Sequence, residues 1–184
     1  MRKLLLVLLF FPLISFAQLG EYWSGKNHPK AKGLNFKIQK PIGFSQDDAV
    51  RPNIVQIWEN EDINIMILVY EQNFELTTSE MTDYLKNGGV KEIVSTFPKD
   101  LNTKNEKFIV LDNYPVLFYQ QLQTQTRLDI TMSFYSYTYS AMVENYTFMF
   151  QLYSETLGGL IENRKLFDKM ANSIVFPDQY NYEL

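Results

Sequence analysis

Few residues of this chain have the side-chain chemistry of a catalytic or metal-binding site. The chain has no cysteine and a single histidine, His28, within Asn27-His28-Pro29-Lys30. Without cysteine there is no disulfide, thiolate zinc site or thiol nucleophile, and one histidine leaves a Ser-His-Asp triad or a multi-histidine metal site almost nowhere to come from. A catalytic histidine needs a fixed partner that orients it. Because His28 lies in a polar segment, we expect it to be exposed and to have no catalytic role.

Carboxylates are the second candidate for chemistry. They cluster at Asp47-Asp48 and at Glu59, Glu61 and Asp62. A hydrolase that acts on carbohydrate needs only two acids, but their environments must push the two pKa values apart. Both clusters stand among turn residues, so we interpret them as solvated turns. A carboxylate-dependent hydrolase stays open as an alternative, as does weak calcium binding at the second cluster.

A row of tyrosines is the most distinctive candidate for binding. Tyrosine occupies every second position from Tyr135 to Tyr139, and this spacing places side chains on one side of a strand. Tyrosine has a flat apolar ring and a hydroxyl that needs a hydrogen-bond partner. We expect this face either to be covered in part by a helix or to bind a peptide, a sugar or a lipid-like molecule. The predicted ligand-binding residues are Tyr119, Tyr135, Tyr137, Tyr139 and Tyr153.

The same alternation predicts an apolar face on the other side of these strands. Burial of this face is the largest favourable contribution to the folding free energy that the chain has available. The residues assigned to it are Val116, Phe118, Leu122, Ile130, Met132, Phe134, Phe148, Phe150 and Leu152. The opposite, tyrosine-containing face also receives Gln121, Met149 and Gln151. We therefore expect one face of the sheet to be apolar and the other to be rich in tyrosine.

The first 17 residues have the pattern of a signal peptide. Arg2 and Lys3 precede an uncharged apolar run, Leu4 to Phe16, and Ser15-Phe16-Ala17 forms a small-x-small cleavage pattern. The run is shorter than the roughly 20 residues of a membrane span, so we expect cleavage after Ala17, no membrane span afterwards, and a periplasmic or secreted protein. A formal charge of −4 gives no reason to expect nucleic acid, and no sequence motif calls for a cofactor.

Turn residues and apolar periodicity divide the rest of the chain. We expect a flexible lead over 18–33, one domain over 34–176 and a polar tail over 177–184, because 46% apolar residues are too many for a disordered chain. A capping box at Thr77–Glu80 predicts a helix from Thr78 that breaks at Asn87-Gly88-Gly89. The remaining expected elements are a strand around Leu34–Gln39, a hairpin of Ile54–Glu59 and Ile63–Glu71, a loop over Phe97–Glu106, strands at Lys107–Leu111, Val116–Thr124, Leu128–Thr138 and Tyr146–Ser154, and a helix over Leu160–Ser173.

Short connections between the late strands favour antiparallel neighbours, since a parallel crossover needs a dozen or more residues. The fold class expected is therefore α+β, with an antiparallel sheet of about six to seven strands flanked by helices.

Several motifs resemble the PsbP-like family, which includes the photosystem extrinsic subunit and bacterial exported relatives. They are Phe36-x-Ile38-x-x-Pro41-x-Gly43-Phe44, Asn113-Tyr114-Pro115-Val116, Thr147-Phe148-x-Phe150 and Phe167-x-x-Met170-x-x-Ser173-Ile174. The resemblance covers Leu34 to Phe176, with Tyr114 where the family often has Gly. It implies an α/β/α sandwich and a non-catalytic role in assembly or binding, and it supplies no catalytic residue or metal ligand.

These observations favour an exported, non-catalytic binding or assembly domain of the bacterial envelope, whose partner is a protein or a small molecule. The alternatives are a carboxylate-dependent hydrolase and a purely structural subunit of an envelope complex. Acids gathered in an aromatic cleft favour the hydrolase, whereas a buried tyrosine face with a flat apolar patch outside favours the structural subunit.

Overall fold

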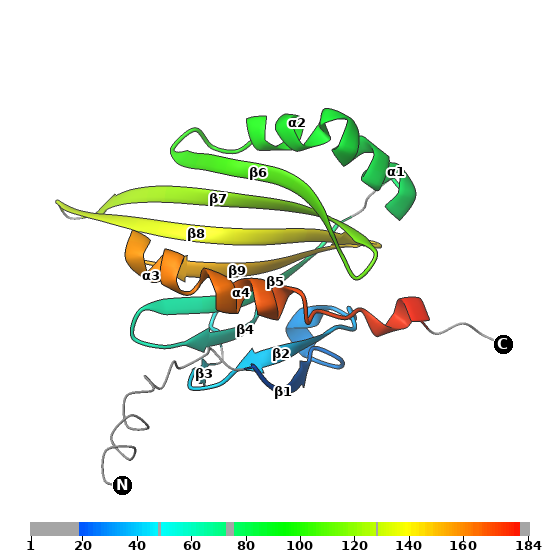
Figure 1. Cartoon of the computed structure of the whole chain (residues 1–184), viewed down its shortest axis with the longest axis horizontal. Coiled ribbons are helices and arrows are strands. Elements are labelled where there is room, and N and C mark those ends of the chain that lie inside the picture. Colours follow the sequence, from blue (N-terminus) through cyan, green and yellow to red (C-terminus); the bar gives the residue numbers. More distant parts are fainter. Residues whose placement is uncertain (1–18, 48, 73–75, 128, 181–184) are drawn as a thin grey trace, which may run out of the picture.

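The computed structural model describes residues 19–47, 49–72, 76–127 and 129–180. Within these ranges seven strands form one antiparallel sheet in the order β3-β4-β5-β9-β8-β7-β6, and β1 and β2 form a separate two-stranded sheet (Figure 1). The strands are β1 (Leu19–Ser24), β2 (Lys37–Pro41), β3 (Ser45–Asp47), β4 (Ile54–Glu59), β5 (Ile63–Glu71), β6 (Leu101–Leu111), β7 (Tyr114–Arg127), β8 (Ile130–Val143) and β9 (Tyr146–Ser154).

Helices lie on both sides of the large sheet. They are α1 (Thr78–Tyr84), α2 (Val90–Ser95), α3 (Leu157–Glu162) and α4 (Arg164–Ala171). In Figure 1 α3 and α4 cross the middle of the sheet, whereas α1 and α2 lie beside its β6 edge. The predicted α+β class, an antiparallel sheet flanked by helices, is confirmed. In the described ranges no helix has the length and apolar character needed to cross a bilayer.

Each face of the sheet has its own apolar cluster. We call the inner face the side that carries Ile65, Phe118 and Phe150, which packs against α3, α4 and β2. The outer face carries Leu117 and Met149, and α1 and α2 pack on it. The second cluster is formed by Met81, Leu85, Val90, Leu117 and Tyr119. The sheet therefore lies between two helical layers of unequal size.

Tight turns fix the antiparallel order of the late strands. Asp112-Asn113 joins β6 to β7, and Glu144-Asn145 joins β8 to β9. Asp112, Asn113 and Glu144 have φ angles of 46°, 70° and 51°, the left-handed conformation of hairpin turns. The strands run further than their sequence pattern predicts, and the expected loop over Phe97–Glu106 is strand from Leu101 onward. This part of β6 is polar because it lies at the edge of the sheet, where water replaces a neighbour.

The helical predictions agree with the structure in part. The Thr77 side chain accepts from the N–H of Glu80, and the Glu80 carboxylate accepts from the N–H of Thr77 at 2.9 Å, so the capping box is present. The helix breaks where expected, with Gly88 at a φ of 111°. The single helix expected over Leu160–Ser173 is wrong, because α3 and α4 are separate and meet at Asn163, whose ψ is 0°.

The segment expected to be a flexible lead, 18–33, contains regular secondary structure from Leu19 onward. Its residues from Leu19 to Ser24 form β1, which pairs with β2, and Trp23 packs 5.8 Å from both Phe36 and Trp58 between ring centres. His28 is half-buried, and its Nδ1 accepts from the N–H of Lys30 at 3.2 Å at the start of a 3₁₀ helix. A register shift within β1 hides the alternation that would reveal the strand.

The expected polar tail begins as an ordered turn. A 3₁₀ helix covers Pro177–Tyr180, and the carboxylate of Asp112 accepts from the N–H of Phe176 at 2.6 Å, from the Gln179 amide at 2.6 Å and from the Tyr180 hydroxyl. Lys37 of β2 pairs with Val175 through two main-chain hydrogen bonds of 2.8 and 2.9 Å. The segment after α4 is thus held by hydrogen bonds to β2 and to the β6–β7 turn, and β1 is paired with the same strand β2.

Candidate functional site

The strand register separates the five predicted tyrosines. Tyr139 lies opposite Phe118 on β7 and Phe150 on β9, and Tyr137 and Tyr135 follow it on the inner face. Tyr119 and Tyr153 lie on the outer face, opposite Thr138 and Ser136. The prediction that all five share one surface is therefore wrong, as is the assignment of Ile130, Met132 and Phe134 to the main core. The phases of β7 and β9 are as predicted.

The error arose because β8 has apolar or aromatic residues at both phases. Phe134 and Tyr135 are neighbours, so alternation alone does not identify the buried side. Ile130 and Met132 made one phase look more apolar, yet they are 64% and 43% exposed at the far end of the strand. The turn at Glu144-Asn145 decides the register, and it turns Tyr139 inward.

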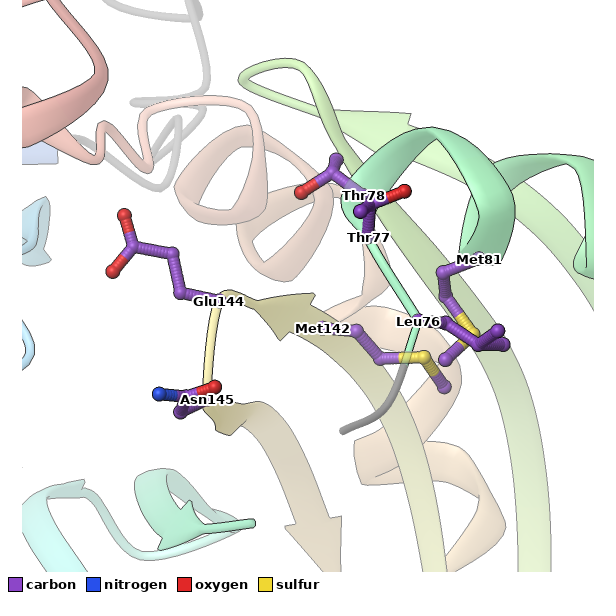
Figure 2. Close-up of a pocket in the computed structure, with 7 residues that line it drawn as sticks. All are labelled: Leu76, Thr77, Thr78, Met81, Met142, Glu144 and Asn145. Atoms are coloured by element: carbon purple, nitrogen blue, oxygen red, sulfur yellow. The ribbon is translucent and has the colours of Figure 1, made fainter. Parts of the chain in front are cut away.

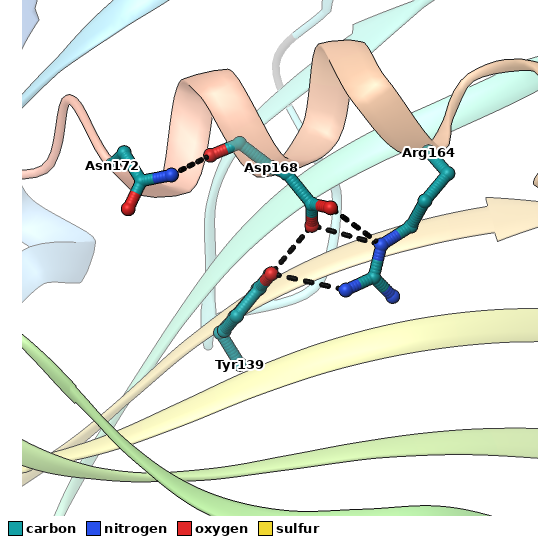
Figure 3. Close-up of polar contacts among 4 residues, drawn as sticks. All are labelled: Tyr139, Arg164, Asp168 and Asn172. Carbon is teal, nitrogen blue, oxygen red and sulfur yellow. Dashed lines mark hydrogen bonds and ion pairs between the residues drawn. The ribbon is translucent and has the colours of Figure 1, made fainter.

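On the inner face Tyr139 joins the sheet to α4 (Figure 3). Its hydroxyl donates to Asp168 Oδ1 at 2.5 Å and accepts from Arg164 at 3.2 Å. Arg164 Nε also donates to Asp168 at 2.9 Å, and its guanidinium carbon lies 4.4 Å from the Phe118 ring centre and 4.3 Å from that of Tyr137. Burial, and then the hydrogen bond to Asp168, raise the pKa of Tyr139 well above its ordinary value. This cluster secures the helix.

On the outer face Tyr119 lies beneath the second apolar cluster. It is buried, and its ring centre is 5.2 Å from that of Phe97, just after α2. Burial raises the pKa of Tyr119 to about 12, and a hydrogen bond with Thr138 opposes this rise. Helices therefore cover the part of the outer face around Tyr119, which is one of the two arrangements expected for a tyrosine face.

The other half of the outer face forms an open groove of about 280 Å³, and none of its lining residues comes from a helix. We call it the glutamine groove. It is lined by Arg51, Ile54, Met66, Leu68, Gln121, Gln123, Phe134, Ser136, Gln151 and Tyr153. Among the five predicted tyrosines, Tyr153 is the one that lines it.

Polar side chains cross the floor of the groove in register. One row runs over five strands through Asn64, Tyr153, Ser136, Gln121 and Thr103. The Gln121 amide donates to Thr103 Oγ1 at 3.1 Å, and in the next row the Gln151 amide donates to Thr138 Oγ1 at 3.1 Å. These bonds fix each amide by its nitrogen. Within the described residues, the two amide oxygens accept no hydrogen bond, so they remain available to a ligand.

An aromatic pair closes one end of the groove. The rings of Phe134 and Tyr153 are stacked, with centres 5.1 Å apart and planes at 25°. Burial raises the pKa of Tyr153 to about 12, Glu155 adds to the rise and Arg51 opposes it. The Tyr153 hydroxyl is therefore protonated at neutral pH and available as a donor. None of the described residues that line the groove is Asp, Glu or His, and Arg51 stands at its exposed margin.

The acidic clusters lie elsewhere. Asp47 is on the edge strand β3, and Glu59, Glu61 and Asp62 surround the β4–β5 turn, whereas Asp48 lies outside the described residues. No group of three His, Asp or Glu in the described ranges is placed to hold a metal ion. Trp58 is buried in the core. The described residues of the glutamine groove do not include the pair of carboxylates that a carboxylate-dependent hydrolase needs.

A second cavity, of about 310 Å³, lies between the start of α1 and the β8–β9 turn (Figure 2). In Figure 2 Leu76, Met81 and Met142 gather on one side and Glu144 points away from them. Thr77, at its margin, is already bonded within the capping box. This cavity offers fewer unused hydrogen-bonding groups than the glutamine groove, so we take the groove as the candidate site.

No family model matches the sequence, and a search of curated proteins finds no match either. Solved structures do match. Cyanobacterial PsbP (CyanoP) from Synechocystis sp. PCC 6803 is 14% identical over 89% of this chain and 95% of that protein, with a TM-score of 0.49. It belongs to the family that the sequence motifs resemble.

Two further solved structures are similar. A protein from Bacteroides thetaiotaomicron VPI-5482 is 10% identical with a TM-score of 0.50; 85% of this chain is covered, and the chain spans about half of that protein, 48%. LpqN, involved in cell envelope biogenesis of Mycobacterium tuberculosis, is 8% identical over 76% of this chain and 82% of that one, with a TM-score of 0.41. At these identities the likeness concerns the fold.

Proposed function

We propose that this protein is an exported, non-catalytic binding domain of the bacterial cell envelope, and that the glutamine groove is its ligand-binding site. The observation that carries the proposal is the uncovered half of the outer face, where neutral hydrogen-bonding groups stand in register beside a stacked aromatic pair. Strands hold these groups, and sites built on strands are positioned more precisely than sites on loops. A concave, partly apolar site with a few convergent polar groups is typical of ligand binding.

Export rests on the sequence of residues 1–17, which lie outside the described residues. All the described strands lie after the expected cleavage position, so a cut after Ala17 leaves each of them intact. Expression of the whole chain in a bacterium, followed by intact-mass measurement of the periplasmic fraction, tests this. We expect the mass of residues 18–184, and a mass that includes Met1 to Ala17 contradicts it.

Gentle purification from the periplasm followed by native mass spectrometry tests the binding role. We expect a small-molecule adduct on the wild-type protein that is lost in a Gln151→Leu/Tyr153→Ala variant and retained in the matched control Tyr22→Ala, which removes an exposed tyrosine on β1. An adduct that both variants retain, or none on the wild type, refutes binding in the groove. A protein-sized adduct retained by the groove variant favours the structural-subunit alternative.

A further inference from the structure

We infer that the ligand of the glutamine groove is a short neutral saccharide of one or two sugar rings. This inference rests on the proposed function and adds the class of ligand. The volume of about 280 Å³ lies just below the roughly 300–1,000 Å³ of typical small-molecule sites, and so suits a small ligand. The following features of the groove select among ligands of that size.

The hydrogen-bonding groups match those of a sugar. Each sugar hydroxyl is both a donor and an acceptor, so it pairs with an amide oxygen and a hydroxyl at the same time. The groove presents the amide oxygens of Gln121 and Gln151 as acceptors, and the Ser136 and Tyr153 hydroxyls as groups that donate or accept. Each amide nitrogen already donates to a threonine, so its orientation is set before the ligand arrives.

The aromatic pair matches the other surface of a sugar. A pyranose ring has an apolar C–H face beside its polar rim, and aromatic rings are the side chains that combine large apolar contact area with rigidity. Phe134 and Tyr153 supply such a platform at one end of the groove, and Met66 and Leu68 supply aliphatic contact at the β5 side. Polar and apolar contacts therefore meet at the same small site.

Other ligand classes fit less well. A phosphate group or a nucleic acid calls for several cationic groups or helix N-termini, whereas the groove has Arg51 and no helical residue. An acyl chain would remove the Gln121 and Gln151 oxygens from water without a partner, which is costly. A peptide that binds by strand addition needs a free sheet edge for its main-chain hydrogen bonds, and this groove lies on the face of the sheet.

Side-chain amide signals in ¹⁵N NMR spectra of the chain over residues 18–184 provide the test. The saccharide probes are maltose, cellobiose and N,N′-diacetylchitobiose, and the comparison probes are trialanine and hexanoate. We expect at least one disaccharide to shift the Gln121 and Gln151 amide signals saturably. Tyr153→Ala should weaken its binding by about tenfold or more, Gln121→Met should also weaken it, and the matched control Tyr22→Ala should leave it unchanged.

The outcomes separate the inference from the proposed function. If none of the disaccharides shifts these amides at up to about 50 mM, the saccharide inference is wrong. If trialanine or hexanoate shifts them instead, or if the native adduct proves not to be a sugar, the groove still binds and the proposed function stands. If no probe binds and the purified protein has no adduct, both the saccharide inference and the proposed function are wrong. Backbone spectra of Tyr153→Ala and Gln121→Met establish that each variant is folded.

Discussion

The hydroxyl of Tyr139 makes the most direct test of how α4 is held on the sheet. Tyr139→Phe keeps the ring contacts with Phe118 and Phe167, whose centres lie 5.1 and 5.3 Å away, and deletes the donor to Asp168. A hydrogen bond to a charged group contributes about 1.5–3 kcal/mol. Because the Asp168 side chain is 39% exposed, water restores part of its solvation, and we expect a loss near the lower end, about 1.5 kcal/mol.

Urea unfolding followed by circular dichroism measures this loss. With an m-value of about 2 kcal/mol/M, the midpoint should fall by about 0.75 M. The matched control is Tyr137→Phe, because the Tyr137 hydroxyl has no hydrogen bond within the described residues, and its midpoint should change by less than about 0.25 M, equivalent to about 0.5 kcal/mol. Equal midpoints for the two variants would refute the role assigned to the Tyr139–Asp168 bond.

Three further predictions concern other parts of the fold. An added Cβ at Gly25 would lie 2.3 Å from the buried ring of Phe36, so Gly25→Ala should destabilise the protein by about 2 kcal/mol in urea; an unchanged midpoint contradicts a packed N-terminal segment. Thr77→Ala removes the α1 cap that bonds Glu80 and should cost about 1 kcal/mol, whereas no loss in thermal unfolding argues against the capping box. Burial raises the pKa of Tyr119 from an ordinary 10 to about 12, so its contribution to stability is complete below pH 10 and falls by roughly 3 kcal/mol as pH rises through 12. Tyr119→Phe should weaken that decline, and identical pH profiles of the two proteins rule it out.

Local chemistry explains the elements that the sequence predicts well. The hairpin of Ile54–Glu59 and Ile63–Glu71 has the predicted boundaries, because β-branched residues flank a polar turn. The capping box and the glycine break around Gly88 depend on neighbouring residues alone. The sequence does not predict β1, which is short, or the first half of β6, which is polar. Each is held in a sheet by its main-chain pairing and not by an apolar side-chain pattern.

In the candidate site, too, the residues set by local pattern were predicted, and those set by distant contacts were missed. Gln121, Gln151 and Tyr153 were assigned to the correct face, since β7 and β9 each have one clearly apolar phase. Ser136 and Phe134 of the same groove were assigned to neither that face nor a site, because β8 is aromatic on both sides and a distant turn sets its register. Arg51 reaches the groove from the segment before β4, a proximity that only the assembled sheet creates.

Three phenylalanines link the beginning and the end of the chain in one core. The Phe36 ring lies 4.8 Å from that of Phe148, which in turn lies 5.3 Å from Phe176 between centres. These contacts join β2 to β9 and to the segment after α4, and contacts of such long sequence separation form slowly. This part of the core therefore forms late in folding, because it needs residues from both ends of the described chain.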